Sequence, residues 1–115
     1  MATSLEDISS LRLWKGIIAE FLGTLLLTLV GCGSCIGTGT QPGVVQIALC
    51  FGLSVATIVW VIGHVSGGHI NPAVTAAMLV TRKISVAKAV FFVLFQVSGS
   101  KLFHGFHYFI SCTKD

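Results

Sequence analysis

Two long runs with little or no charge most constrain how this chain can fold. Residues 44–62 contain no charged side chain, and residues 14–36 contain only Lys15 near their start and Glu20 inside. An α-helix rises 1.5 Å per residue, so roughly 20 apolar residues span the hydrocarbon core of a bilayer. Both runs are therefore predicted to form transmembrane helices, over about 14–36 and 44–62.

A third apolar run begins near residue 84 and is predicted to be a weaker span. It is unbroken from Ala89 to Phe95, but Gln96 and then Lys101 follow. Only 10% of the chain is charged, whereas a soluble domain carries about a quarter of charged residues. We therefore expect an all-α transmembrane fold with two to three membrane helices in a lipid bilayer.

The basic residues indicate how these helices are oriented. None of the seven lies in the connection between the first two predicted spans, and five lie near the ends of the spans: Arg12, Lys15, Arg82, Lys83 and Lys88. Because Lys and Arg favour the cytoplasmic side, residues 1–12 and 63–83 are expected in the cytoplasm and residues 33–43 outside. The basic residues form flanks rather than a patch, so nucleic acid is not an expected partner.

The cysteines and histidines give no persuasive metal site. Cys32 and Cys35 form a single C-x-x-C pair at the end of an apolar helix, where small packing residues are the simpler interpretation. His104 and His107 lie three residues apart near Cys112, and no other ligand accompanies them. We predict no metal and no cofactor, and the sequence offers no catalytic nucleophile.

Small residues recur at helical spacing in both predicted helices. They are Gly16, Ala19 and Gly23 in the first, and Ala48, Gly52 and Ala56 in the second. Such stripes let helix backbones approach closely in lipid. They favour a tightly packed polytopic bundle, and the alternative is the ordinary abundance of glycine in membrane helices.

Glu20 is the unusual residue of the first predicted helix. A carboxylate near the middle of a membrane costs a few kcal/mol on insertion scales, so it should face the protein interior. A proton relay would need further titratable groups, and the second helix contains none. The other interpretation is structural, in which Glu20 accepts hydrogen bonds from irregular backbone in the 63–70 region.

The segment SGGHINPAV, residues 66–74, predicts a short helix that starts inside the membrane. Asn71 is a strong helix cap, Pro72 suits the first helical position, and the helix should run over 72–80. Nine residues span only ~13 Å, less than half a bilayer. An uncharged short helix on the cytoplasmic side favours a re-entrant segment, and the alternative is a cytosolic loop with a short amphipathic helix.

Non-helical backbone is tolerated at membrane depth only where it is buried in protein or lines a water-filled cavity. The paired glycines permit unusual dihedral angles, so the carbonyl groups of Gly67, Gly68 and His69 would face a polar passage. The half-helix would place Asn71 near the bilayer midplane, at the positive end of its dipole.

These residues resemble the aquaporin, or major intrinsic protein, family. VSGGH followed by HINPAVT (65–75) resembles its first NPA box, AEFLGT (19–24) its first-helix motif, and RKISVAKAVFFVLFQ (82–96) the start of its third helix. With FGLSVATIVWVIGHVSGGHINPAVT (51–75), the resemblance covers about residues 12–96 and is closest to the animal water-selective branch. It implies the amino-terminal half bundle of that fold, over 13–96, with one re-entrant half-helix.

The resemblance also implies residue roles. Asn71 would donate hydrogen bonds to passing water, and Pro72 and Ala73 would hold the half-helix against its partner. Gly67, Gly68 and His69 would supply the carbonyl ladder. Phe51 would belong to the outer selectivity filter and Glu20 would steady the re-entrant loop, while His64 is given no role. The family implies passive water transport, a tetramer and the plasma membrane.

The resemblance covers only part of the family pattern. One NPA box and at most three spans are present, and residues 97–115, VSGSKLFHGFHYFISCTKD, are read as a divergent tail. A water channel protein in a truncated form unable to conduct alone is the first expectation. A non-conducting short form that associates with full-length aquaporins, and a structural or adhesive membrane protein, are the alternatives.

Overall fold

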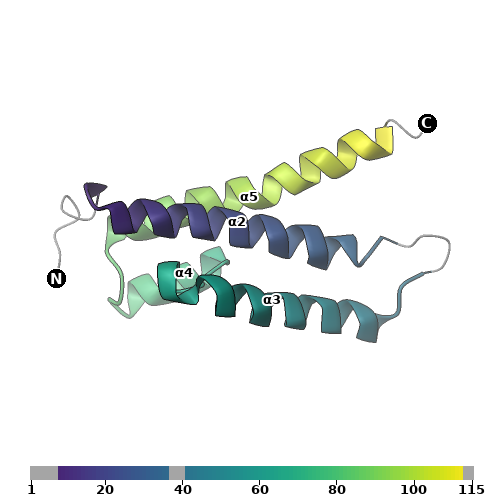
Figure 1. Ribbon diagram of the computed structural model, residues 1–115, viewed down its shortest axis with the longest axis horizontal. Helices are drawn as coiled ribbons and strands as arrows, with labels where there is room; N and C mark the ends of the chain where they lie inside the picture. The colour runs from purple at the N-terminus through teal and green to yellow at the C-terminus, as the bar shows by residue number, and fades with distance from the viewer. Residues whose placement is uncertain (1–7, 37–40, 113–115) are drawn as a thin grey trace.

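The computed structural model describes residues 8–36 and 41–112, and every regular element within these residues is a helix (Figure 1). The helices are α2 (Leu11–Gly33), α3 (Val44–Ser66), α4 (Pro72–Val80) and α5 (Val86–Cys112). In length and composition α2, α3 and residues 86–108 of α5 can each cross a membrane. The predicted all-α transmembrane class is confirmed, with three long helices and one short helix.

The first helix begins and ends three residues earlier than the predicted range of 14–36. The Ser10 side chain accepts a hydrogen bond from the backbone N–H of Leu13 at 3.2 Å and so caps the helix. The helix therefore includes Arg12, ahead of the apolar run. At the other end Gly33 is the last helical residue, and residues 34–36 form turns.

The second helix extends one turn beyond the predicted end at Ile62. It continues through His64 to Ser66 and ends at Gly67, whose backbone adopts φ +99°. The Gly67 N–H donates to the Gly63 carbonyl at 2.9 Å. The apolar run therefore underestimates this helix, because glycine and not polarity ends it.

The short helix α4 has the predicted bounds, 72–80. The Asn71 side chain accepts a hydrogen bond from the Ala73 N–H at 2.8 Å, and Pro72 occupies the first turn. After Thr81 the chain turns at Arg82, where φ is +57°.

Helix α5 starts at Val86, two residues after the predicted start, and the Ser85 hydroxyl accepts from the Lys88 N–H at 3.3 Å. The helix passes Gln96 and Lys101 without a break. The boundary at residue 97 is therefore not a change of secondary structure, and the divergence of the tail stays a prediction. Residues 113–115 of that tail, and residues 1–7 of the predicted amino-terminal segment, lie outside the described residues.

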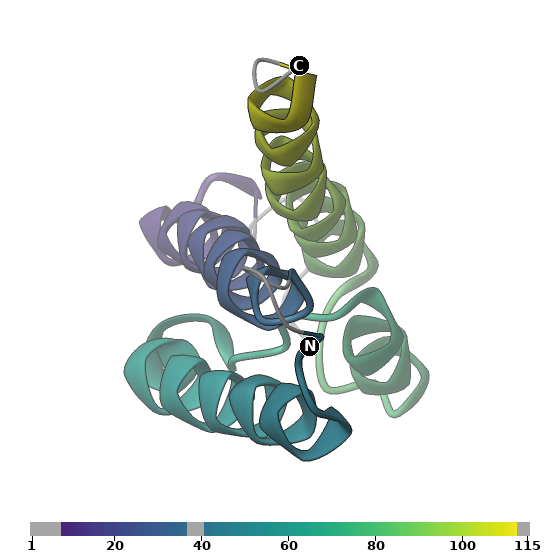
Figure 2. The same ribbon diagram turned by 90° about the vertical axis from the view of Figure 1, so that its right-hand side faces the viewer.

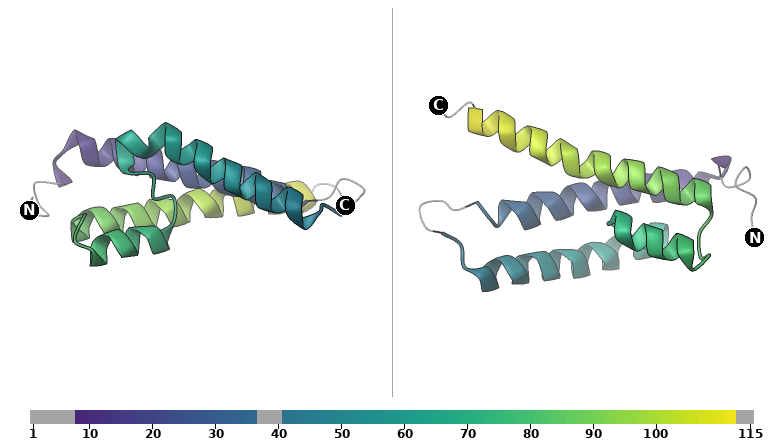
Figure 3. Two further views of the ribbon diagram at one scale, coloured as in Figure 1. Left: turned by 90° about the horizontal axis from the view of Figure 1, so that it is seen from below. Right: turned by 180° about the vertical axis from the view of Figure 1, so that it is seen from behind.

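Helix α2 lies at the centre of the arrangement and packs against both α3 and α5 (Figure 2). The buried apolar cluster is formed by Leu13, Ile17 and Phe92, between α2 and α5. After α3 the chain doubles back, and α4 then runs beside α5 toward the end of the molecule where α2 begins (Figure 3). This course is the one expected of a half-helix that enters and leaves on one side.

The two predicted stripes of small residues have different surroundings. Gly16 and Gly23 of α2 are buried, and a Cβ atom on Gly16 would lie 3.2 Å from the Phe92 ring. The stripe of α3 is exposed, and a Cβ atom on Gly52 would meet nothing within 4 Å. Close packing through the α3 stripe is therefore not made by the described residues, because α2 lies against another face of that helix.

Candidate functional site

The segment between α3 and α4 has a backbone that few sequences can adopt. Gly67, Gly68 and Ile70 have φ angles of +99°, +65° and +42°. Glycine tolerates such angles freely, but a β-branched residue such as Ile70 is strained there, by about 1–3 kcal/mol. Surrounding contacts must hold this segment, which, together with Ser66 at the end of α3, we call the linker (residues 66–71).

Glu20 supplies most of these contacts. Its Oε1 accepts hydrogen bonds from the Ser66 hydroxyl at 2.6 Å and the His69 N–H at 2.9 Å. Its Oε2 accepts from the Ile70 N–H at 2.6 Å and from the Gln96 amide at 2.7 Å. The Glu20 side chain is fully buried, and these bonds tie the central helix to the linker and to α5, as the structural interpretation expects.

Gln96 is a member of this site that the sequence analysis did not assign. It is fully buried, and its Nε2 donates to both Glu20 Oε2 and the Thr75 hydroxyl, at 2.7 and 3.0 Å. The Thr75 hydroxyl also lies 3.1 Å from Nδ1 of His69. A lone amide in an apolar helix was the signal that could have revealed it, because a buried polar side chain needs partners.

Gly23 makes room for the strained residue. A Cβ atom on Gly23 would lie 2.8 Å from Cγ2 of Ile70 and 2.7 Å from Cδ1 of Ile62. Ile70 is 5% exposed, so its side chain fits closely against the glycine of α2. The AEFLGT motif therefore holds the linker with two residues three positions apart. Glu20 forms hydrogen bonds with it, and Gly23, which has no side chain, leaves room for Ile70.

The start of α4 is open. Asn71, Pro72 and Ala73 are exposed, whereas Thr75, one helical turn further, is fully buried. Because the Asn71 carboxamide oxygen caps the helix, its NH₂ group is the part left to donate to a ligand. The linker carbonyl oxygens of Gly67, Gly68 and His69 accept no hydrogen bond from the described residues. The site therefore offers one amide donor and a row of acceptors.

Phe51 is not part of this cluster. It lies near the start of α3, and its ring packs over Gly31, where a Cβ atom would lie 2.5 Å from Cε1. The structure thus brings Glu20, the linker and Asn71 to one region and leaves Phe51 near the other end of α2. Its predicted place in a selectivity filter is not tested by these contacts.

The major intrinsic protein family has a sequence model that matches residues 7–113 of this chain. Aquaporin-4 of Mus musculus is 50% identical to the chain over an alignment of 103 residues that covers 85% of this chain and 32% of the mouse protein. Aquaporin-4 of Homo sapiens is also 50% identical over 103 residues, with the same coverage. The lens fiber major intrinsic protein of Gallus gallus is 45% identical over 97 residues, 84% of this chain and 37% of the chicken protein.

The chain thus spans about one third of the length of the Aquaporin-4 proteins it matches. The family match also continues past Gln96, to residue 113. The similarity therefore includes α2, α3, the linker, α4 and the whole of α5.

Proposed function

The chain belongs to the major intrinsic protein family, and from this premise we propose that it forms part of the wall of a passive water channel and is not an enzyme. The supporting observation is the linker, whose irregular backbone is held by the buried Glu20 carboxylate through the His69 and Ile70 N–H groups. Strained backbone at membrane depth is costly, so its presence here supports a role in conduction.

The proposed pathway passes along the linker to the start of α4. Water would exchange hydrogen bonds with the carbonyls of Gly67, Gly68 and His69 on one wall and with the Asn71 amide at the half-helix. Pro72 and Ala73, both exposed, would meet an opposing half-helix, and Phe51 would narrow the outer end. The positive end of the α4 dipole at Asn71 would repel cations, protons included.

The Asn71 role can be tested in a chimaera in which the part of mouse Aquaporin-4 that matches this chain is replaced by the chain. Asn71→Ala removes both the cap and the donor, and losing a cap costs about 0.5–2 kcal/mol. Asn71→Ser keeps an oxygen that can cap the helix, but it replaces the NH₂ donor by a hydroxyl on a shorter side chain. Both variants should lower osmotic water permeability per molecule at the cell surface, and the alanine variant should also lower surface abundance.

Permeability is measured by swelling of cells, and abundance by surface labelling. Ala76→Ser, an exposed change on the same short helix, is the matched control and should leave both unchanged. Unchanged permeability per surface molecule in Asn71→Ser would contradict a conducting role for the Asn71 amide.

We also propose that the protein is a plasma membrane protein with residues 1–12 and 63–83 in the cytoplasm. The support is the positive charge at the shared end of α2 and α5, which carries Arg12, Lys83 and Lys88 (Figure 1). A cysteine placed at Thr81, in a background without native cysteines, should react with an impermeant maleimide only after the membrane is permeabilised. Labelling of this cysteine in intact cells would place residue 81 outside the cell and contradict the proposed orientation.

A second proposal is that these 115 residues act as a non-conducting form that associates with full-length aquaporins. The exposed start of α4 and the exposed α3 stripe favour it, because both surfaces are suited to close contact with another helix. Proteoliposomes that contain only this chain should then show the permeability of empty liposomes in stopped-flow light scattering. Permeability clearly above that background, abolished by Asn71→Ala, would favour a self-assembled channel instead.

A further inference from the structure

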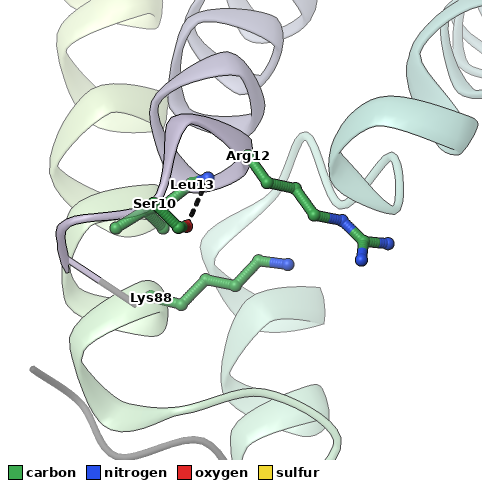
Figure 4. A pocket seen from close by; sticks show the side chains of 4 residues that line it. All are labelled: Ser10, Arg12, Leu13 and Lys88. Carbon is green, nitrogen blue, oxygen red and sulfur yellow. Dashed lines mark hydrogen bonds between the residues drawn. The ribbon is translucent and has the colours of Figure 1, made fainter. Parts of the chain in front are cut away.

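A cavity separate from the linker lies where α2 begins beside the first turns of α5. Its volume is about 260 Å³, and Ser10, Arg12, Leu13 and Lys88 line it (Figure 4). This is several times the roughly 30 Å³ that one water molecule occupies in the liquid. The cavity therefore has room for a polyatomic group.

The lining is positively charged from two helices. Arg12 projects from the first turn of α2 and Lys88 from the first turn of α5, and none of the four lining residues is acidic. The Lys88 ammonium also lies 5.1 Å from the centre of the Phe92 ring, a contact that positions it. The Ser10 hydroxyl accepts from the Leu13 N–H and can still donate its own hydrogen. Two cations and a hydroxyl are the donors that recognise a phosphate group.

The cavity lies beside surfaces suited to lipid. Trp14, 43% exposed, follows the lining residues in α2, and its ring lies 6.0 Å from that of Phe91. Tryptophan is enriched at the interface between membrane and water. Leu11 and Val90, 69% and 52% exposed, offer apolar surface on the same two helices. A ligand with a charged head and an apolar tail would match this combination.

We propose that this cavity binds the phosphate of an acidic phospholipid headgroup, with Arg12 and Lys88 as its cationic partners. Basic pockets between transmembrane helices on the cytoplasmic side bind such headgroups. The apolar surface of Leu11 and Val90 favours a lipid over free phosphate. The proposal does not depend on conduction, because it concerns a surface at the end of α2 away from Gly33.

The test uses the full chain in phosphatidylcholine nanodiscs that contain a photoactivatable phosphatidylinositol phosphate. Cross-linked lipid is measured by mass spectrometry as the lipid fraction is raised. The double variant Arg12→Gln/Lys88→Gln should lose apparent affinity by about fivefold for each cation removed. The matched control, Lys15→Gln/Lys83→Gln, removes the same charge from the same end but outside the cavity, and should change the affinity less than twofold.

Three outcomes would overturn the proposal. Equal losses in the two double variants would show general attraction to surface charge. Unchanged cross-linking in Arg12→Gln/Lys88→Gln would exclude the cavity. Displacement of the lipid by millimolar inorganic phosphate, at concentrations that also bind in lipid-free detergent, would identify a free-anion site. If the glutamine double variant does not fold, the single variants Arg12→Gln and Lys88→Gln decide instead. Each should lose about fivefold in apparent affinity, whereas Lys15→Gln should lose less than about twofold, and equal losses in the three would overturn the proposal.

Discussion

Helices α2 and α3 are each 23 residues long and apolar enough to cross a membrane, but their surroundings differ. Seven residues of α2 are buried: Leu13, Gly16, Ile17, Glu20, Gly23, Thr24 and Gly31. In α3 only Ile58 and Ser66 are buried. Hydropathy therefore identifies a span without showing whether protein or lipid surrounds it.

The difference follows from the position of α2 between two neighbours. Glycines bring α3 and α5 close to it from different sides, and Glu20 receives donors from the linker and from α5. Helix α3 contacts mainly α2, and its remaining surface is free for lipid or another chain. If this comparison is right, changes in α2 should be costly and matched changes in α3 should not.

The largest effect is expected for Glu20→Leu. The substitution leaves four donors without their acceptor, those of Ser66, His69, Ile70 and Gln96. Each unsatisfied buried group costs about 1–3 kcal/mol. The variant should express poorly and lose protease resistance in detergent, measured by limited proteolysis of the purified chain.

Glu20→Gln should be milder, because one oxygen can still accept from Ser66 and His69. Gln96 can turn its own amide oxygen toward the new NH₂ group, so the Ile70 N–H is the main donor left unpaired. Protease resistance should therefore rank wild type, then glutamine, then leucine. A leucine variant as resistant to protease as wild type would contradict the structural role of Glu20. It would also contradict the expectation that changes in α2 are costly.

Much of this arrangement is predictable from local sequence. Asn71 and Pro72 set the start of α4 and the uncharged runs set the spans, because caps and hydropathy act over a few residues. The hydrogen bonds from the linker backbone to Glu20 also follow from the cost of a carboxylate in a membrane.

A lone amide in an apolar helix indicates that Gln96 needs a buried partner, but the identity of that partner could not be predicted. Gln96 lies far from Glu20 in sequence and is paired with it only by the packing of α5 on α2. The start of α2 and the end of α3 were misplaced for a simpler reason. Capping by Ser10 sets the first and the positive φ of Gly67 sets the second, and the edge of an apolar run does not. Small-residue spacing likewise predicted contact without identifying which of two stripes would be buried.

An intermediate effect is expected from adding one methyl group to α2, with the matched change in α3 as the comparison. In Gly23→Ala the new Cβ would lie 2.7 Å from Ile62 Cδ1 and 2.8 Å from Ile70 Cγ2, so both side chains must shift. Overpacking of this kind costs about 1–3 kcal/mol. In Gly52→Ala the methyl group enters open space and should change stability little. The two midpoints of thermal unfolding in the same detergent are the measurement.

The Gly23 variant should unfold at a clearly lower temperature and the Gly52 variant within error of wild type. Equal losses would mean that the α3 stripe is also in close contact, through association of chains in the micelle. Size-exclusion chromatography with light scattering measures the mass of the protein in the micelle. A monomeric mass would exclude association and would mean that α3 is not more exposed than α2.

The smallest effect is expected from the tryptophans, one on each helix. Trp14 contacts the Phe91 ring, and its indole N–H donates to the Ile8 carbonyl at 3.2 Å. Replacing Trp14 by leucine should cost about 0.5–1.5 kcal/mol, the usual value of an aromatic pair. Trp60 is 89% exposed, so Trp60→Leu should change stability by less than about 0.5 kcal/mol. Unfolding monitored by the remaining tryptophan compares the two variants in one assay. If Trp60→Leu lost more stability than Trp14→Leu, another protein chain would have to cover α3. The difference in burial between the two helices would then hold for the single chain and not for its assembled form.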